Sequence, residues 1–412
     1  SIYAKPGNMT PGSDGKTIDG MSVDRIGHLI AALKDESYMP TPARRVYIPK
    51  KNGKKRPLGI PSIEDKMVQE VVRLILEAVY EGHFENSSHG FRPRRSAQMA
   101  VLKTLEYINE GYDWVIDLDI EAYFDTVNHD KLISIFREKN VNDSTTLHLI
   151  RKFMQAGIME DGLVKPSRIG VPQGGPLSPI LSNIYLDKFD KELEYRGLRF
   201  VRYADDCNIF VKSEMSANRV MKSVTSWLER KLFLKVSATK TKVVRPPESK
   251  FLGFTYLQRN GEWKCKPSNQ SKMKLYDKCR RELIRRIGIA RPIAVTFKRI
   301  NQIVVGWINY YRIGVMKYFV DVFGQWLRHK IRVIILKQWK KPRRIYINLQ
   351  KLNKKLSCRF TDEEIISVAN TRLGLYRQAY GHVVNFLLSP KILAIKKKDR
   401  PGLVNPLNYY LS

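Results

Sequence analysis

The sequence predicts an α+β fold in which an antiparallel sheet is backed by helices and is followed by a helical, strongly basic segment. Three observations support this prediction. Strand-like and helix-like hydrophobic patterns interleave, with short connections, as far as residue 260. From Gly261 onward the strand character fades and helical periodicity dominates. The charge divides at the same place, since residues 261–412 carry 33 Lys and Arg against 8 Asp and Glu, whereas residues 1–260 carry 40 against 32.

The first elements are a helix and a hairpin. A turn-rich stretch, 11–15, precedes helical periodicity over 26–33. Residues 45–49 then alternate as a strand and lead through a basic turn, 50–56, into a second short strand that ends near Ile60. We therefore expect a hairpin with a cationic tip.

A helix over 64–82 separates this hairpin from a strand at 114–120. The strand has two faces: Trp114, Ile116, Leu118 and Ile120 lie on one, and Val115, Asp117 and Asp119 on the other. Helices from Asp130 and from Thr145 follow, and then a turn at Asp161 and Gly162.

A second hairpin is expected at 199–203 and 208–211, with Asp205 and Asp206 at its bend. Before it, the loop 171–176 introduces a helix whose apolar positions are Ile180, Leu181, Ile184 and Tyr185.

The last third is expected to be helical. Leu275, Cys279, Leu283 and Ile287 recur at every fourth position, with basic residues between them, which predicts one amphipathic helix. Residues 297–341 continue as helices rich in aromatic residues, and residues after 342 form a small, mostly helical basic module.

The length, the cysteine content and the net charge of the chain indicate what class of protein it is. A chain of 412 residues with 43% hydrophobic residues folds as several packed modules. Its four scattered cysteines form neither a zinc framework nor a disulfide pattern, and a reducing interior suits them. The net charge of +33 favours a polyanionic partner. We expect nucleic acid rather than anionic lipid, because no amphipathic membrane anchor accompanies the charge and no apolar run reaches the ~18 residues that span a bilayer.

Three carboxylates carry the expected chemistry. Asp205 and Asp206, taken alone, suit an ordinary solvated turn. Asp119 ends an apolar strand, so the three side chains converge on one sheet edge if the two strands are neighbours. Such oxygen-rich sites suit Mg²⁺, and two ions ~3.5–4 Å apart stabilise both the attacking and the leaving oxygen of an in-line displacement. The arrangement predicts nucleotidyl transfer.

Other residues suit a nucleoside triphosphate. Lys50 and Arg56 flank the basic turn and can bind phosphate, although an exposed cationic turn explains them equally well. The ring of Phe124 can exclude a ribose 2′-hydroxyl, or it is a plain core residue. Gln173 offers an amide beside Gly174, a glycine that lets a backbone approach nucleic acid closely.

Five ordered segments resemble the palm motifs of reverse transcriptases: 117–125, 171–179, 203–206, 240–242 and 251–254. This resemblance implies a right-hand polymerase with fingers, palm, helical thumb and a basic C-terminal module. It implies Asp119 and Asp205 as principal metal ligands, with Asp206 and the Ile120 carbonyl beside them. It implies Lys240 as an acid near the leaving pyrophosphate. The remaining implied roles are a primer-holding turn at Phe251, Leu252 and Gly253, and contacts of Lys50, Arg56, Phe124 and Gln173 with the incoming dNTP.

Further segments resemble the reverse transcriptases and maturases that group II introns encode: 11–15, 56–61, 89–93 and 301–314. The implied domains are an N-terminal extension (1–40), fingers (41–111), palm (112–260), thumb or maturase domain (261–341) and a DNA-binding-like module (342–412). The implied contacts with nucleic acid are Arg92, Gly174, Lys278, Arg281 and Arg285. The implied partners are intron RNA, an RNA template with a DNA or RNA primer, target DNA and dNTPs, in a bacterial, cytoplasmic intron ribonucleoprotein.

The resemblance departs from the family at both ends. The start looks truncated within a longer product, and no His-Asn-His endonuclease module follows the basic tail. Mobility is then expected to use nicks or fork primers made by other proteins. Two alternatives stay open: a related reverse transcriptase recruited to defence or CRISPR spacer acquisition without maturase activity, and an RNA-dependent RNA polymerase.

Overall fold

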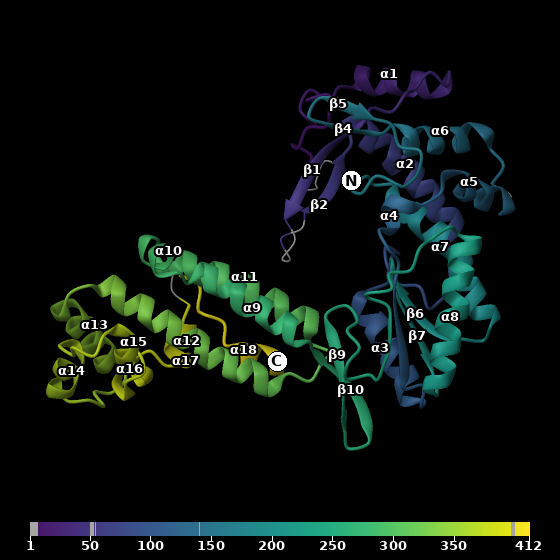
Figure 1. The fold of residues 1–412 in the computed structure, drawn as a ribbon. Helices are drawn as coiled ribbons and strands as arrows, with labels where there is room; N and C mark the ends of the chain where they lie inside the picture. The colour runs from purple at the N-terminus through teal and green to yellow at the C-terminus, as the bar shows by residue number, and fades with distance from the viewer. Residues whose placement is uncertain (1–6, 50–52, 54, 140, 397–399) are drawn as a thin grey trace. The chain divides into compact units, whose positions relative to one another are not determined.

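The structure, a computed structural model, describes residues 7–49, 53, 55–139, 141–396 and 400–412. The chain divides into two compact units, Ser1–Phe251 and Leu252–Ser412 (Figure 1). The division falls ahead of the boundary after residue 260 that the sequence predicts. The reason is a hairpin, β9 (Phe254–Arg259) and β10 (Glu262–Pro267), which belongs to the second unit.

Unit 1 contains a sheet with the strand order β2-β1-β4-β5. Its strands are β1 (Ala43–Pro49), β2 (Lys55–Ile60), β4 (Ile158–Glu160) and β5 (Leu163–Lys165). The expected hairpin is confirmed, because β1 and β2 pair antiparallel from Arg44 opposite Ile60 to Pro49 opposite Lys55. β4 and β5 turn at Asp161 and Gly162, whose φ angles of 51° and 81° fit a tight hairpin. The parallel pairing of β4 with β1 was not predicted.

The helices of unit 1 are α1 (Val23–Lys34), α2 (Ile63–Tyr80), η1 (Glu81–His83), α3 (Ala97–Asn109), α4 (Tyr123–Thr126), α5 (His129–Glu138), α6 (Ser144–Gln155), α7 (Ser178–Tyr195) and α8 (Glu214–Lys231). The predicted helices of unit 1 are confirmed as α1, α2, α5, α6 and α7, whereas α3, α4 and α8 were not predicted. Several begin where a side chain caps the helix. Ser62, for example, accepts a hydrogen bond from the Asp65 amide at the start of α2.

A second sheet in unit 1 has the order β6-β7-β3-β8 and is antiparallel throughout. Its strands are β3 (Trp114–Asp119), β6 (Arg199–Tyr203), β7 (Asp206–Val211) and β8 (Lys242–Val244). Ile116 and Leu118 face the main core, which includes α7 and α8 residues. Val115 is also fully buried, because α3 covers the opposite face, where Tyr107 contacts Phe210 (Figure 1).

Unit 2 is helical after its hairpin. Its helices are α9 (Asn269–Glu282), α10 (Arg285–Ala290), α11 (Ile293–Tyr311), α12 (Lys317–Trp339), α13 (Pro342–Lys355), α14 (Asp362–Ala369), α15 (Leu375–Gln378), α16 (His382–Leu387), α17 (Pro390–Ala394) and α18 (Pro406–Leu411). The aromatic residues of 297–341 pack ring against ring: Trp307, Phe319, Phe323 and Trp326, joined by Tyr276 of α9, form one cluster in which Phe323 is buried and the others are half-buried.

The prediction of a single amphipathic helix that contains both Leu275 and Ile287 is wrong in one respect. Ile284 has extended backbone angles (φ −57°, ψ 131°), so the helix ends and α10 starts afresh at Arg285. Arg291 donates to the Glu282 carbonyl at 2.7 Å and satisfies the end of α9. Leu283 is buried, as predicted, but Ile287 is exposed.

None of the helices in the described part of the chain is long and apolar enough to cross a membrane.

Candidate active site and nucleic-acid surface

Asp119 and Asp206 are direct cross-strand partners at the end of the β3/β7 pair. Opposite residues in an antiparallel pair project to the same face, with Cβ atoms about 4.5–5.5 Å apart. Asp205 precedes Asp206 in the β6/β7 turn, next to Ala204, whose φ of 58° is left-handed. The strand adjacency on which the sequence argument depended is therefore present.

Lys240 lies at this carboxylate group. Its Nζ donates to Asp119 Oδ1 at 2.8 Å, and the side chain is 66% exposed. The neighbouring residue Thr241 accepts a hydrogen bond from the Asp119 amide at 3.2 Å. The hydrogen bond to Asp119, followed by the charges of Asp119, Asp205 and Asp206, raises the pKa of Lys240. The lysine is therefore a protonated donor at neutral pH.

The carboxylates repel one another. Burial of the carboxyl, followed by the charges of Asp205 and Asp119, raises the pKa of Asp206 to about 6. The Asp206 residue is exposed to solvent, beside the charges of Asp205 and Asp119. A divalent cation bound here would relieve this repulsion. Among the described residues, no three Asp, Glu, His or Cys side chains are close enough together to share one ion.

Ile120 continues β3 as an isolated bridge to Val236. Its neighbours make the backbone hydrogen bonds there: the Glu121 amide donates to the Lys235 carbonyl at 2.8 Å, and the Ser237 amide donates to the Asp119 carbonyl at 2.9 Å. These bonds fix the backbone on both sides of the Ile120 carbonyl, the atom that we expected at the metal.

The structure brings Arg56 and Gln173 together across 117 positions of sequence. Arg56 Nε donates to Gln173 Oε1 at 3.1 Å, and the Gly59 amide donates to the Gln173 carbonyl at 2.7 Å. The third predicted triphosphate residue, Lys50, lies outside the described residues.

The structure gives a reason for a glycine at position 174 that the sequence did not predict. The φ of Gly174 is 121°, and an added Cβ would lie 2.5 Å from the Gly59 carbonyl oxygen. A close backbone approach to β2 therefore requires glycine at this position.

Phe124 lies in α4, half-buried against the core. Its ring centroid is 5.4 Å from that of Tyr123, and its carbonyl accepts a hydrogen bond from the Val171 amide at 2.6 Å. The ring is thus both packed and partly accessible, which leaves both interpretations from the sequence open.

The expectation that Arg92 contacts nucleic acid is wrong. Its side chain is buried, 4% exposed, and pairs with Glu81 at 2.9 Å. Nη1 donates to the carbonyls of Glu85 and Ser88 at 2.7 and 2.9 Å. These contacts occupy the guanidinium, so Arg92 ties together the loop that follows α2 and η1.

The expected primer-holding turn falls on the boundary between the units. Phe251, the last residue of unit 1, is buried, so its ring is not available to a ligand. Leu252 and Gly253 open unit 2 with φ angles of 51° and 81°. The Leu252 carbonyl accepts from Tyr310 Oη at 3.0 Å, and an added Cβ on Gly253 would lie 2.5 Å from the Tyr311 hydroxyl oxygen. The turn is thus positioned by α11.

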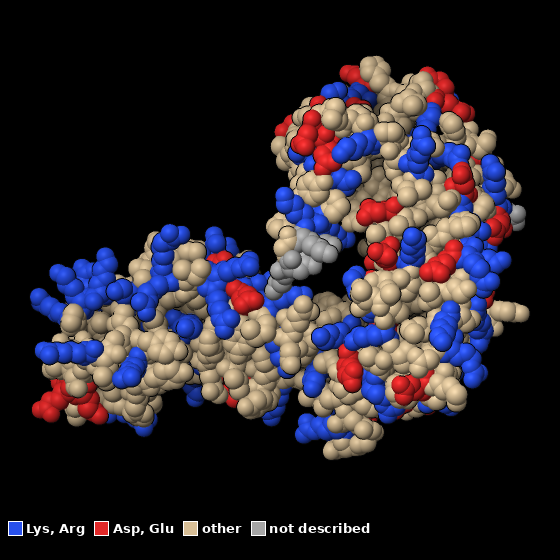
Figure 2. Space-filling model, in the orientation of Figure 1, with Lys and Arg blue, Asp and Glu red and all other residues tan. Residues whose placement is uncertain are grey.

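Unit 2 presents a basic surface. Lys278 and Arg281 on α9 and Arg285 on α10 are all exposed, as predicted. Lys278 and Lys274 line a pocket of about 340 Å³ together with Trp307 and Tyr310. Figure 2 shows Lys and Arg gathered over the part of unit 2 that carries α10 and α13. Cations interleaved with aromatic rings suit a polyanion that also carries bases.

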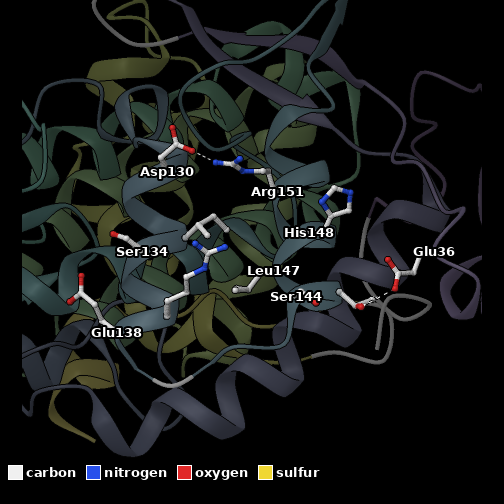
Figure 3. Close-up of a pocket in the computed structure, with 11 residues that line it drawn as sticks. Glu36, Asp130, Ser134, Glu138, Ser144, Leu147, His148 and Arg151 are labelled. Carbon is white, nitrogen blue, oxygen red and sulfur yellow. Dashed lines mark hydrogen bonds and ion pairs between the residues drawn. The ribbon is translucent and has the colours of Figure 1, made fainter.

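A cavity of about 930 Å³ lies in unit 1, between α5 and α6 (Figure 3). Asp130 pairs with Arg151 there, and Thr145 donates to Glu36 at 2.9 Å. None of the candidate catalytic or nucleotide-binding residues lines it.

Asp117 was missed as part of the site. It accepts hydrogen bonds from Ser249 Oγ at 2.7 Å and Asn208 Nδ2 at 3.2 Å, and burial raises its pKa. It ties β3 to β7 and to the segment before Phe251. Its position two residues before Asp119, on the same strand face, was the available signal.

Comparisons with known proteins agree with this geometry. A family model described as Reverse transcriptase (RNA-dependent DNA polymerase) matches residues 48–256, and one described as Group II intron, maturase-specific domain matches residues 272–352. Group II intron-encoded protein LtrA of Lactococcus lactis subsp. cremoris is 45% identical over 203 residues, which are 49% of this chain and 34% of that protein. The match thus spans about a third of that relative's length.

Protein YkfC of Escherichia coli is 33% identical over 302 residues, 62% of this chain and 78% of that protein. A solved structure of telomerase from Candida albicans covers 82% of this chain and 67% of that chain, with a TM-score of 0.44 and 13% identity. The first family match covers half of the chain and YkfC is covered over more than two thirds of its length, so the chain belongs to the reverse transcriptase family.

Proposed function

We propose that this protein is an RNA-directed DNA polymerase that also binds group II intron RNA as a maturase. The observation that carries the first activity is the pairing of Asp119 with Asp206 across β3 and β7, with Asp205 in the adjoining turn. Lys240, whose Nζ donates a hydrogen bond to Asp119, completes the group. Family membership and the relative LtrA support the same activity.

The proposed mechanism uses two Mg²⁺ ions, held by Asp119, Asp205, Asp206 and the Ile120 carbonyl. Bound Mg²⁺ supplies Lewis acidity, which lowers the pKa of a primer 3′-hydroxyl and neutralises triphosphate charge. Lys240 holds the proton that the leaving pyrophosphate takes up, and its raised pKa keeps that proton in place until it is needed.

The incoming dNTP is proposed to lie along Arg56 and Gln173, and Lys50 is proposed as a further phosphate ligand. The Arg56 guanidinium provides a planar fork for phosphate, and Gln173 orients that fork through its 3.1 Å hydrogen bond. Phe124 is proposed to exclude a ribose 2′-hydroxyl.

The maturase activity is proposed for unit 2, where binding rather than catalysis is needed. Lys278, Arg281 and Arg285 are exposed, and residues 261–412 carry 33 basic against 8 acidic residues. The match to the maturase-specific domain supports intron RNA as the ligand. An RNA template with its primer, and target DNA, are the further proposed partners. The proposed setting is a bacterial, cytoplasmic intron ribonucleoprotein.

Primer extension on an RNA template, with and without Mg²⁺, tests this proposal. Asp205→Ala should abolish extension and leave RNA binding and assisted splicing largely intact, because the RNA itself performs splicing. Extension that survives Asp205→Ala would show the carboxylate assignment to be wrong. Extension with rNTPs in place of dNTPs would identify an RNA polymerase instead.

A further inference from the structure

Arg202 is a fully buried arginine in β6, three residues before Asp205. It is 1% exposed, and its partner Asp190, on α7, is 0% exposed. The pair is a planar fork: Arg202 Nε donates to Asp190 Oδ1 at 2.7 Å, and Nη2 donates to Oδ2 at 2.5 Å. Asp190 therefore fixes the plane of the guanidinium.

The remaining donors of Arg202 reach the active-site turn and its surroundings. Nη1 donates to the Ala204 carbonyl at 2.9 Å and to Asn183 Oδ1 at 3.2 Å. Nη2 donates to Ser88 Oγ at 2.8 Å. Ala204 is the left-handed residue of the turn, and its carbonyl directly precedes Asp205.

The backbone around Arg202 is clamped by the segment 87–90. The Arg202 amide donates to the Ser87 carbonyl at 2.8 Å, and the Arg202 carbonyl accepts from the His89 amide at 2.9 Å. Asn183 Nδ2 donates to the Gly90 carbonyl at 2.8 Å. An added Cβ on Gly90 would lie 2.2 Å from the Ala204 nitrogen, so this segment lies directly against the turn.

Two forces oppose the conformation of this turn. A left-handed conformation is strained for a residue other than glycine. The carboxylates of Asp205 and Asp206 also repel each other and Asp119. A buried ion pair is weak evidence for a stabilising role, since an apolar pair of similar volume often serves the fold as well. An apolar pair cannot, however, donate a hydrogen bond to the Ala204 carbonyl.

We propose that Arg202 is a positioning residue: clamped by Asp190, its guanidinium holds the Ala204 carbonyl and so fixes the turn that carries Asp205 and Asp206, beside the strand partner Asp119, for cation binding. This inference rests on the proposed polymerase function and adds a residue that touches neither substrate nor metal.

The decisive variant is Arg202→Met combined with Asp190→Leu, which replaces the buried pair by apolar side chains. The expected result is a folded protein with a lower unfolding temperature, because the Ala204 carbonyl, Asn183 and Ser88 lose a buried donor. Mn²⁺ affinity, measured by calorimetric titration without nucleic acid, should fall roughly tenfold to a hundredfold, the range for losing one charge-assisted hydrogen bond. The Mg²⁺ concentration that half-saturates primer extension should rise by a similar factor. Wild-type Mn²⁺ affinity and Mg²⁺ dependence in this folded variant would overturn the proposal.

Arg202→Lys is the second variant, for the case that the double variant does not fold. A lysine keeps the charge beside Asp190 but has one nitrogen in place of a three-nitrogen fork. The Arg202→Lys variant should also bind Mn²⁺ more weakly than the wild type. An unchanged Mn²⁺ affinity would again overturn the proposal.

Arg332→Met is the matched control. Arg332 is another buried arginine, in unit 2, and donates to the Leu388 carbonyl at 3.1 Å and to Asn385. Its loss should lower the unfolding temperature and leave Mn²⁺ affinity unchanged. A drop in Mn²⁺ affinity in this control would show that general destabilisation, not the turn, sets the affinity. A wild-type protein that neither extends primers nor binds Mn²⁺ would instead refute the proposed function itself.

Discussion

Lys240 Nζ lies 2.8 Å from Asp119 Oδ1, so the first of the three candidate metal carboxylates is paired with a lysine. That contact gives Lys240 two possible uses, as a counter-charge and as a proton donor, which substitution separates. Lys240→Ala should lower kcat for primer extension by roughly 10²–10⁴-fold, the usual contribution of a general acid.

Lys240→Arg distinguishes the two uses. Arginine keeps the charge opposite Asp119 but does not release its proton in proteins. Single-turnover extension should remain slow in this variant if Lys240 is the acid. Recovery of the wild-type rate would assign Lys240 a purely electrostatic role.

The raised pKa of Asp206 predicts a pH-dependent stability. The pKa of its carboxyl is about 6 in the folded protein against an ordinary value of 3.8, so the folded state holds more protons than the unfolded state between these values. Stability contributed by this group therefore falls as the pH rises from about 4 to 6. Asp206→Asn should match the wild type at pH 4 in EDTA and be the more stable protein at pH 7. Urea unfolding across this range measures the difference, and added Mg²⁺ should reduce it. A constant difference at all pH values would contradict the assignment.

Gly174→Ala should disturb the contact between β2 and the Gln173 loop. The added Cβ would lie 2.5 Å from the Gly59 carbonyl oxygen, at a φ that disfavours alanine. Overpacking of this kind costs about 1–3 kcal/mol, and because Gln173 moves with the loop, KM for dNTP should rise. Gly27→Ala in α1 is the control, since nothing lies within 4 Å of its added Cβ. If the two variants changed KM for dNTP equally, the Gln173 loop would have no specific role in nucleotide binding.

Phe124→Val tests the sugar gate. If the ring excludes a 2′-hydroxyl, discrimination between dNTP and rNTP in kcat/KM should fall roughly tenfold to a hundredfold, the range that one small group in a pocket produces. If Phe124 is only a core residue, the unfolding temperature should fall and the ratio should not change. Steady-state kinetics with matched dNTP and rNTP and a thermal melt distinguish these results.

Charge reversal of Lys278, Arg281 and Arg285 to Glu should weaken RNA binding and flatten its salt dependence. Three lost phosphate contacts should reduce the slope of log K against log salt by about 2. The matched control reverses three exposed basic residues of α8, Arg219, Lys222 and Arg230. Filter binding at several salt concentrations measures both. A control that flattens the slope equally would show that total charge, rather than this surface, binds the RNA.

Local patterns explain what the sequence predicted correctly. The β1/β2 hairpin and β3 were predicted because alternation and turn residues lie within a few positions of one another. Asp119 and Asp206 converge because β3 and β7 are neighbouring strands. The order of the reverse-transcriptase motifs predicted that the strands are neighbours, whereas hydrophobic periodicity did not.

The features that the sequence did not predict depend on contacts between distant segments or on patterns with more than one interpretation. The parallel pairing of β4 with β1 joins segments more than a hundred residues apart. The β9/β10 hairpin carries polar, half-exposed strands, although Asn260 and Gly261 offered a turn signal. Arg92 and Arg202 have the same sequence character as surface cations, and only burial against Glu81 and Asp190 identifies them as internal.

The strand order also has a consequence for how the active site forms. β3 lies between β7 and β8, so Asp119 meets its partners only after segments near residues 206 and 240 have reached it. Such long loops make closure slow relative to local helix formation. A ribosome-bound chain that has not yet synthesised β7 therefore has no assembled carboxylate group, and it lacks the contact of Lys240 with Asp119 until the segment near residue 240 has also emerged, so the complete site forms late in synthesis.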